Sequence, residues 1–318
     1  MTAAHCRHGP APVESLARLV GSTPLVRLRR IGAELPGLRL YAKCEFMNPG
    51  GSVKDRPALR MIETALADGR FGTSKTLVDS TSGNTGVAYA WICAALGLRC
   101  ALVMPANVTA ARKRIARAFG AELVFSDPLE GSDGAIRKVR ELVSSEPGRW
   151  FYPDQYGNPE NPLAHELGTA VEIAEALDDR VAAFVAGIGT GGTVMGTSRG
   201  LRARVPGVRC FAVEPAEPLH GLEGLKHMAS SIMPPIYREE ELDEKIALPT
   251  AEGWAMAERL GHEEGLRVGH SAGAAVAGAL EVARRMAAAG ETGNVVTILP
   301  DRADRYFEPR QWERKIVW

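Results

Sequence analysis

Short apolar runs alternate with helix-forming segments along most of the 318-residue chain, and this alternation is the strongest constraint on its fold. The apolar runs expected as strands include 39–45, 76–79, 99–104, 182–186 and 294–299. Helices are expected between them, and strands separated by helices form parallel sheets that are covered on both faces. The sequence therefore predicts the α/β fold class, with mostly parallel twisted sheets flanked by helices.

The composition narrows the class of protein further. Hydrophobic residues make up 45% of the chain, charged residues make up 24%, and the formal net charge is zero. This predicts a globular protein whose main partner is neither nucleic acid nor an anionic membrane, because both favour a basic excess. No apolar run approaches the ~18 residues of a membrane-spanning helix, and the first residues do not resemble a secretory signal.

The five cysteines are scattered and form no CxxC pair, which argues against a disulfide framework and against a zinc site. His5, Cys6 and His8 resemble a ligand cluster, but they lie in an N-terminal stretch that is expected to be disordered, so no metal is predicted. These features favour a cytoplasmic location.

The segment NPGGSVKDR (48–56) places Lys54 between a glycine-rich turn and the start of a helix. A lysine that is held in one place and shielded from water is partly deprotonated, and it can then act as a nucleophile, for example in a Schiff base. Lys54 is therefore the first candidate catalytic residue.

A second candidate segment, GIGTGG (187–192), follows an apolar strand and opens a helix. Its glycines let the backbone approach a ligand, and the N–H groups at a helix start attract phosphate. Gly187, Gly189 and Gly192 also satisfy the dinucleotide-binding pattern GxGxxG, with Glu214 at the end of the next strand. This segment alone fits a nicotinamide enzyme, a pyridoxal-phosphate enzyme or a tight turn without a ligand.

Two more turns that open helices favour pyridoxal phosphate. The loop STSGNTG (80–86) carries four hydroxyls and the amide of Asn84, which is more than helix capping needs. Its helix start suits a substrate carboxylate, and Asn84 suits a phenolic oxygen. In GHSAG (269–273), Ser271 offers a neutral partner to a ring nitrogen, which suits elimination at a β-carbon. Helix capping is the alternative for both turns.

Together these segments resemble the cysteine synthase family (O-acetylserine sulfhydrylases), which shares the tryptophan-synthase-like pyridoxal-phosphate fold with cystathionine β-synthase. The similarity runs in order from LVGSTPLV (19–26) to LPD (299–301) and so covers nearly the whole chain. It implies two domains, a small mobile one at 37–149 and a large one formed by 1–36 and 150–318. It also implies a homodimer.

The resemblance implies a role for each segment. Lys54 would be the Schiff-base lysine, Asn84 would lie beside the ring oxygen and Ser271 at the ring nitrogen. The cofactor phosphate would lie on Gly189, Thr190, Gly191, Gly192 and Thr193. The substrate carboxylate would lie on Thr81, Ser82, Gly83, Asn84 and Thr85, with Gln155 closing over it.

The implied reaction is β-replacement, which makes L-cysteine from O-acetylserine or O-phosphoserine and a sulfur donor. The substrate amine displaces Lys54, which then removes the α-proton and returns a proton after the sulfur has added to the β-carbon. The alternatives are condensation of serine with homocysteine, as in cystathionine β-synthase, a NAD-binding dehydrogenase, and a non-catalytic binding protein that kept the fold.

Residues 216–242 form a long segment without periodicity, and a loop of that length in a compact domain is usually functional. Within it, HGLEGLKHM (220–228) resembles the B-type branch of the family. There are two interpretations of Lys226. It could face the leaving group of the substrate, and a fixed cation there would favour a phosphate. Alternatively it faces water, as most lysines do. No residue indicates whether the sulfur donor is sulfide, thiosulfate or the thiocarboxylate of a sulfur-carrier protein.

Overall fold

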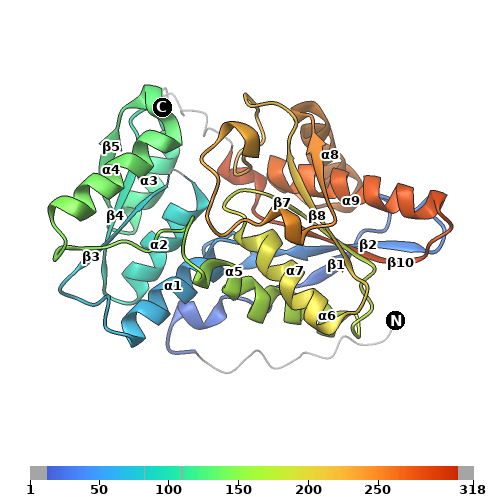
Figure 1. Ribbon diagram of the computed structural model, residues 1–318, viewed down its shortest axis with the longest axis horizontal. Helices are drawn as coiled ribbons and strands as arrows, with labels where there is room; N and C mark the ends of the chain where they lie inside the picture. The colour runs from blue at the N-terminus through green and yellow to red at the C-terminus, as the bar shows by residue number, and fades with distance from the viewer. Residues whose placement is uncertain (1–12, 82, 109, 307–318) are drawn as a thin grey trace, which may run out of the picture.

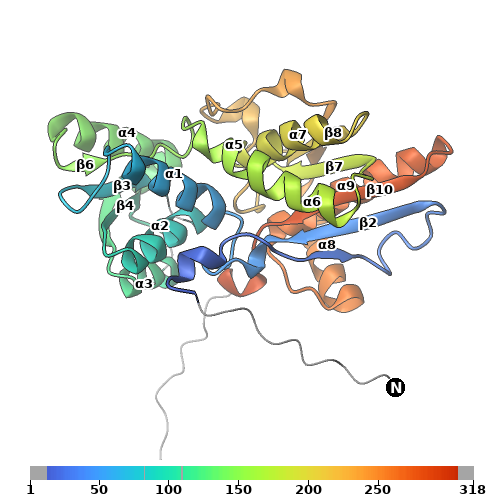
Figure 2. The same ribbon diagram turned by 90° about the horizontal axis from the view of Figure 1, so that it is seen from below.

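The computed structural model describes residues 13–81, 83–108 and 110–306, and these form two sheets flanked by helices (Figure 1, Figure 2). The larger sheet has six strands in the order β1-β2-β10-β7-β8-β9, and the smaller sheet has four in the order β5-β4-β3-β6. The strands of the larger sheet are β1 (Leu25–Arg27), β2 (Leu38–Cys44), β7 (Ala183–Gly187), β8 (Arg209–Pro215), β9 (Glu244–Leu248) and β10 (Gly293–Leu299). Those of the smaller sheet are β3 (Thr76–Ser80), β4 (Arg99–Pro105), β5 (Glu122–Ser126) and β6 (Trp150–Phe151).

Helices cover both sheets and give the molecule two lobes. The α-helices are α1 (Asp55–Ala67), α2 (Asn84–Ala95), α3 (Ala110–Ala118), α4 (Gly131–Ser145), α5 (Glu160–Ala164), α6 (Ala170–Ala176), α7 (Gly192–Arg204), α8 (Thr250–Glu264) and α9 (His270–Ala288). The smaller lobe, on the left of Figure 1, combines the four-stranded sheet with α1 to α4. The larger lobe combines the six-stranded sheet with α6 to α9.

The strands that carry the sheets are buried on both faces. All five residues of β3 and four of the five residues of β7 are buried, which explains why these strands appear as continuous apolar runs. Among the described residues, every named strand pair is parallel except β1–β2, which is antiparallel. The predicted α/β class with mostly parallel sheets flanked by helices is confirmed.

The elements that the sequence does not predict are β1, β6, β9 and α5. β1 has three residues and β6 has two, so neither is long enough to show a period. The sequence predicts a helix only from Leu167, whereas α5 already begins at Glu160. Pro162 lies in the first turn of α5, where a proline is tolerated because its missing N–H would have no helical acceptor.

The two sheets divide the chain differently from the expected small domain at 37–149. β2 lies within that range, but it pairs with β1 and β10 in the larger sheet. β6 lies just beyond that range, but it pairs with β3 in the smaller sheet. The division into a mobile and a fixed domain stays a prediction.

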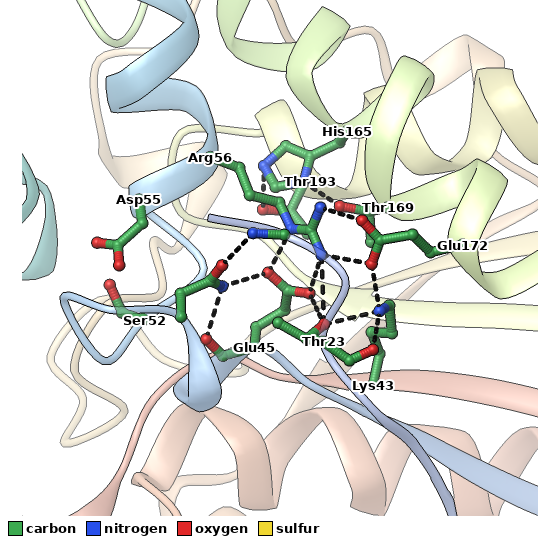
Figure 3. A network of polar contacts seen from close by, with 12 residues as sticks. Thr23, Lys43, Glu45, Ser52, Asp55, Arg56, His165, Thr169, Glu172 and Thr193 are labelled. Atoms are coloured by element: carbon green, nitrogen blue, oxygen red, sulfur yellow. Dashed lines mark hydrogen bonds and ion pairs between the residues drawn. The ribbon is translucent and has the colours of Figure 1, made fainter. Parts of the chain in front are cut away.

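A buried network of charged side chains ties β2 to α1 and α6 (Figure 3). The Arg56 guanidinium donates to both oxygens of Glu45, at 2.7 and 2.8 Å, and to both oxygens of Glu172, each at 2.7 Å. Lys43 also donates to Glu172. Burial alone would raise the pKa of Glu172, but the hydrogen bonds and charges of Arg56 and Lys43 lower it to about 2. Because α1 starts directly after Lys54, this network anchors the helix that carries the candidate lysine.

The described residues contain no group of three or more His, Cys, Asp or Glu side chains arranged to hold a metal ion. His5, Cys6 and His8 lie outside the described residues. Cys44, Cys93, Cys100 and Cys210 are buried and free. None of the helices described here has the length and the apolar character that crossing a membrane requires.

Candidate active site

A cavity of about 350 Å³ is lined by residues from both lobes. Its walls include Ser80 at the end of β3, Gly187 at the end of β7 and Pro300 directly after β10. The carboxyl ends of parallel strands are where open α/β sheets bind their ligands. The predicted site residues that line it are Lys54, Thr81, Gly83, Asn84, Thr85, Gln155, Gly189, Thr190, Gly191, Thr193, Lys226 and Ser271. Gly192 does not line the cavity but starts α7, and Ser82 lies outside the described residues.

Lys54 precedes α1 and follows a turn in which Gly51 adopts a left-handed conformation, with φ of +78°. The side chain lines the cavity, and its nitrogen makes no hydrogen bond to a described residue. Burial lowers the pKa of the Lys54 amine, and the nearby carboxylate of Asp301 raises it by a smaller amount. A lysine with a lowered pKa in a cavity is available both as a nucleophile and as a base.

The loop at 189–193 leaves room for a ligand because its backbone carries few side chains. At Gly189 an added Cβ would lie 2.4 Å from the carbonyl oxygen of Gly224. Gly191 has φ of +90°, a conformation that favours glycine. The N–H groups in the first turn of α7 have no acceptors within the helix, and the positive end of the helix dipole lies there. The loop is therefore suited to a phosphate group.

The second helix start is held in place by Gln155. The Thr85 hydroxyl donates to Gln155 Oε1 at 2.8 Å, and Gln155 Nε2 donates to the carbonyl of Ser80 at 2.9 Å. Gln155 therefore bridges the strand and the helix that flank the loop 80–86. The N–H of Gly86 in the first turn of α2 donates to Thr81 Oγ1 at 3.1 Å, whereas the N–H groups of Asn84 and Thr85 have no acceptor within the helix and suit an anion.

A relay of hydrogen bonds connects this loop with the one at 189–193. The carbonyl of Gln155 accepts from Asn161 Nδ2 at 2.6 Å, and the same nitrogen donates to Thr190 Oγ1 at 3.2 Å. Thr190 Oγ1 in turn accepts from the N–H of Gly192 at 3.3 Å. Asn161 was not singled out in the sequence, because its role depends on two loops that are distant along the chain.

Sequence reasoning gave no site role to Asp301 and Arg305, which the structure brings to Asn84. Asn84 Nδ2 donates to Asp301, and Arg305 donates to Asn84 Oδ1. The Tyr306 hydroxyl donates to Asp301 as well, and both Arg305 and Tyr306 line the cavity. The one available signal was the run of charged residues directly after the last predicted strand, at the end where parallel strands form sites.

The rim of the cavity carries cations from both lobes. Lys226 lines the cavity, and its ammonium lies 4.8 Å from the ring centroid of Tyr156. Burial lowers the pKa of Lys226, while Asp133 raises it by a smaller amount. Arg112 on α3 forms an ion pair with Glu223 of the larger lobe, and both residues line the cavity.

The nicotinamide interpretation required Glu214 to be free for a ribose hydroxyl. Its carboxylate instead accepts from the N–H of Met228 at 2.9 Å and pairs with Lys245 at 3.3 Å. Glu214 also does not line the cavity. The GxGxxG pattern therefore does not mark a dinucleotide site in this fold.

The residues around the cavity fit pyridoxal phosphate, which presents an aldehyde, a phosphate, a ring nitrogen and a phenolic oxygen. The unpartnered amine of Lys54 fits the aldehyde, and the open first turn of α7 fits the phosphate. The hydroxyl of Ser271 makes no hydrogen bond to a described residue and lines the cavity, as the ring nitrogen requires. Asn84 supplies an amide at the same cavity for the phenolic oxygen.

Comparison with known proteins agrees with this fit. The family model described as "Pyridoxal-phosphate dependent enzyme" matches residues 16–301. A cysteine synthase of Aquifex aeolicus is 48% identical over 296 residues, which cover 92% of this chain and 90% of that protein. A cysteine synthase of Staphylococcus aureus is 37% identical over 306 residues, covering 93% and 96%. The crystal structure of a cysteine synthase from Entamoeba histolytica has a TM-score of 0.87 at 34% identity and covers 96% of this chain and 91% of its own.

The chain therefore belongs to the family of pyridoxal-phosphate dependent enzymes, and pyridoxal phosphate is its cofactor. The predicted resemblance to cysteine synthases is confirmed by these relatives.

Replacing Gly189 by alanine is expected to weaken the binding of pyridoxal phosphate by about tenfold or more. The new methyl group would meet the carbonyl of Gly224, so the loop would have to move. Titration of the apoprotein with pyridoxal phosphate, followed by absorbance, measures the dissociation constant. Gly148→Ala is the control, because an added Cβ there meets nothing within 4 Å. Equal affinities of both variants would show that the loop does not hold the phosphate.

Proposed function

We propose that this protein makes L-cysteine by β-replacement on an O-activated L-serine, with a sulfur compound as the second substrate. The observation that carries this proposal is the unpartnered amine of Lys54 in a cavity that also receives two helix starts and the Ser271 hydroxyl. Two helix starts suit a pair of ligands with two anionic ends, a cofactor phosphate and a substrate carboxylate. The relatives named cysteine synthase support the same reaction.

Each loop has its own part in binding. The backbone at Gly189 to Thr193 holds the cofactor phosphate, Ser271 meets the ring nitrogen and Asn84 meets the ring oxygen. The substrate carboxylate binds to the loop at 81–85, and Gln155 is part of this subsite. Supporting this division, Gln155 already contacts both flanks of that loop through Thr85 and Ser80.

Lys54 would hold the cofactor through its amine, and the same amine would act on the substrate once it is free. Pyridoxal phosphate, when bound, supplies an aldehyde that joins to amines and a ring that takes up electrons from the α-carbon. The freed amine of Lys54 accepts the α-proton, the β-substituent leaves, a sulfur nucleophile takes its place, and Lys54 returns a proton. Because burial lowers the pKa of this amine, a larger fraction of it is neutral and able to accept a proton.

A spectral titration of the yellow holoprotein with O-acetylserine and O-phosphoserine, side by side, tests the proposal. We expect a spectral change with at least one of them, and formation of cysteine when sulfide is added. Thiosulfate and homocysteine in place of sulfide distinguish the sulfur donors, and homocysteine also tests the cystathionine β-synthase alternative. A yellow protein that responds to no O-substituted serine would contradict the proposal and favour a non-catalytic binding protein.

We propose that Lys226 selects the leaving group. It lines the cavity over Tyr156, and a fixed cation stabilises a phosphate dianion more strongly than a neutral acetyl ester. Lys226→Ala is expected to lower kcat/KM for O-phosphoserine about tenfold and to leave that for O-acetylserine nearly unchanged. Lys75→Ala is the control, because the Lys75 ammonium donates to the carbonyl of Arg70 and does not line the cavity. An equal loss with both substrates, or none, would exclude this role.

We also propose that the smaller lobe is the mobile domain and closes over the substrate, which keeps water from the reacting groups. The sheets favour a boundary after β2 and the inclusion of β6, rather than limits at 37 and 149. Limited proteolysis with and without O-acetylserine tests the closure, because a closed smaller lobe is cut more slowly.

We propose a homodimer, as the resemblance implies. Leu16, Leu19, Met47 and Leu167 are large apolar side chains that are 44–58% exposed, and a dimer would cover them. Sedimentation of the purified protein measures the mass directly. The four free, buried cysteines support a cytoplasmic location, where thiols stay reduced. The thiocarboxylate of a sulfur-carrier protein is a further candidate donor, to be added to the same assay.

A further inference from the structure

The amide of Asn84 is held at both ends by residues from the far end of the chain. Its nitrogen donates to Asp301 Oδ2, and its oxygen accepts from Arg305. Asp301 lies just beyond β10, and Arg305 lies in the turn that follows. These contacts join the start of α2, in the smaller lobe, to the larger lobe.

The two partners permit only one orientation of this amide. A guanidinium group can only donate, so the end of the amide that faces Arg305 must be the oxygen. Asp301 Oδ2 accepts two hydrogen bonds, from Asn84 and from Tyr306. As a carboxylate it can only accept, so the end of the amide that faces Asp301 must be the nitrogen. A reversed amide would place donor against donor and acceptor against acceptor.

We propose that Asp301 and Arg305 are positioning residues that orient Asn84, so that the second N–H of its amide faces the cofactor. Asn84 lines the cavity, and only one of the two hydrogens on Nδ2 has a partner among the described residues. The inference rests on the proposed function, in which Asn84 donates to the ring oxygen. Asp301 and Arg305 act on the cofactor through Asn84.

The surroundings of the two positioning residues keep them in place. Tyr306 donates its hydroxyl to Asp301, and its ring stacks on His270 with 5.6 Å between the ring centroids. His270 in turn packs against Trp254, at 5.1 Å. Arg305 also donates to the carbonyl of Gly50, in the turn that precedes Lys54. The group that orients Asn84 is therefore connected to the turn that positions the lysine.

Asp301→Asn in the holoprotein tests the proposal, because an amide at position 301 can accept or donate, so that Arg305 alone still favours one direction of Asn84. The donor to the ring oxygen is then lost in part of the molecules. We expect the yellow absorption band to lose intensity to the ultraviolet band, since a donor favours the ionised ring oxygen. We also expect the affinity for pyridoxal phosphate to fall about tenfold.

A double-mutant cycle with Asn84→Ala separates this role from a merely structural one. If Asp301 acts through Asn84, most of the effect of Asp301→Asn on the band ratio and on the affinity disappears once Asn84 is alanine. The remainder reports the direct effect of the Asp301 charge on Lys54. Asp304→Asn is the matched control, because the exposed carboxylate of Asp304 has Arg302 as its one ion-pair partner among the described residues. It is expected to leave the spectrum and the affinity unchanged.

The proposal is overturned if Asp301→Asn leaves the spectrum of the holoprotein unchanged, or if its effect is the same with and without Asn84. Should Asp301→Asn not fold, the cycle with Arg305→Met decides in the same way. A wild-type protein that binds pyridoxal phosphate but makes no cysteine would refute the proposed function and leave these spectral results interpretable. The two failures are therefore distinguishable.

Discussion

Lys54→Ala is expected to abolish the covalent link to pyridoxal phosphate and to lower turnover by about 10²–10⁴-fold or more, the usual contribution of one proton-transferring group. The substitution removes both the amine that binds the aldehyde and the base that takes the α-proton. Among the described residues, Lys226 is the other lysine that lines the cavity, with its ammonium over the Tyr156 ring. Borohydride reduction of the holoprotein, followed by peptide mass analysis, locates the label.

Lys138→Ala is the control for this experiment, because Lys138 lies on the surface of α4 and, within the part of the chain that the structure describes, pairs with Glu141 alone. It should keep both the label and the turnover of the wild type. Label on another lysine of the wild-type protein, or full turnover in Lys54→Ala, would contradict the assignment. Partial rescue of Lys54→Ala by added small amines would support it, since an external base would then take the proton.

Arg56→Ala is expected to destabilise the folded protein by about 3–5 kcal/mol, the usual cost of leaving a buried charge without its partner. The guanidinium bonds to Glu45, which is 0% exposed, and to Glu172, so its loss leaves one of these carboxylates buried and unpaired. Lys43 still pairs with Glu172 but does not reach Glu45 in the structure. Urea denaturation followed by tryptophan fluorescence measures the change in the free energy of unfolding.

Two further variants identify the cause of the destabilisation. Arg56→Met combined with Glu45→Gln should recover part of the stability, because removing both charges costs less than removing one. Arg180→Ala should change little, because Arg180 and its partner Asp178 are mostly exposed. If Arg180→Ala were as damaging as Arg56→Ala, burial of the network would not explain its contribution.

The free energy of unfolding, measured as a function of pH in the acid range, provides an independent measurement of the contribution of Glu172. The pKa of Glu172 is lowered from 4.5 to about 2, so its contribution is fully present above about pH 4.5 and is lost as the pH falls towards 2. In Arg56→Ala the main group that lowers this pKa is gone, while Lys43 still lowers it. The part of the pH dependence that comes from Glu172 should therefore move part of the way towards pH 4.5.

The sequence was informative where function depends on neighbouring residues. Lys54 beside Gly50 and Gly51, and the loop at 189–193, carry their chemistry within a few positions, so glycine and helix-start patterns were sufficient to find them. Ser271 and Thr85 were found in the same way, because each lies in the first turn of a helix.

The sequence did not predict the features that depend on contacts between distant parts of the chain. Asn84 meets Asp301 across 217 positions, and Arg56 meets Glu172 across 116. The periodic pattern of apolar residues does not indicate such pairs, because only the packing of the folded chain brings them together. The same holds for β6, whose two residues become a strand only because β3 lies beside them.

The relay from Thr85 through Gln155 and Asn161 to Thr190 has a consequence for what the enzyme admits. As long as this relay is intact, the two turns that are proposed to bind anions stay at one separation, which does not adapt to the ligand. A compound whose two acidic groups are too far apart or too close together can bind to one of the two turns but not to both. We therefore expect the relay itself to discriminate between ligands by the distance between their acidic groups, independently of the side chains that contact the reacting carbon.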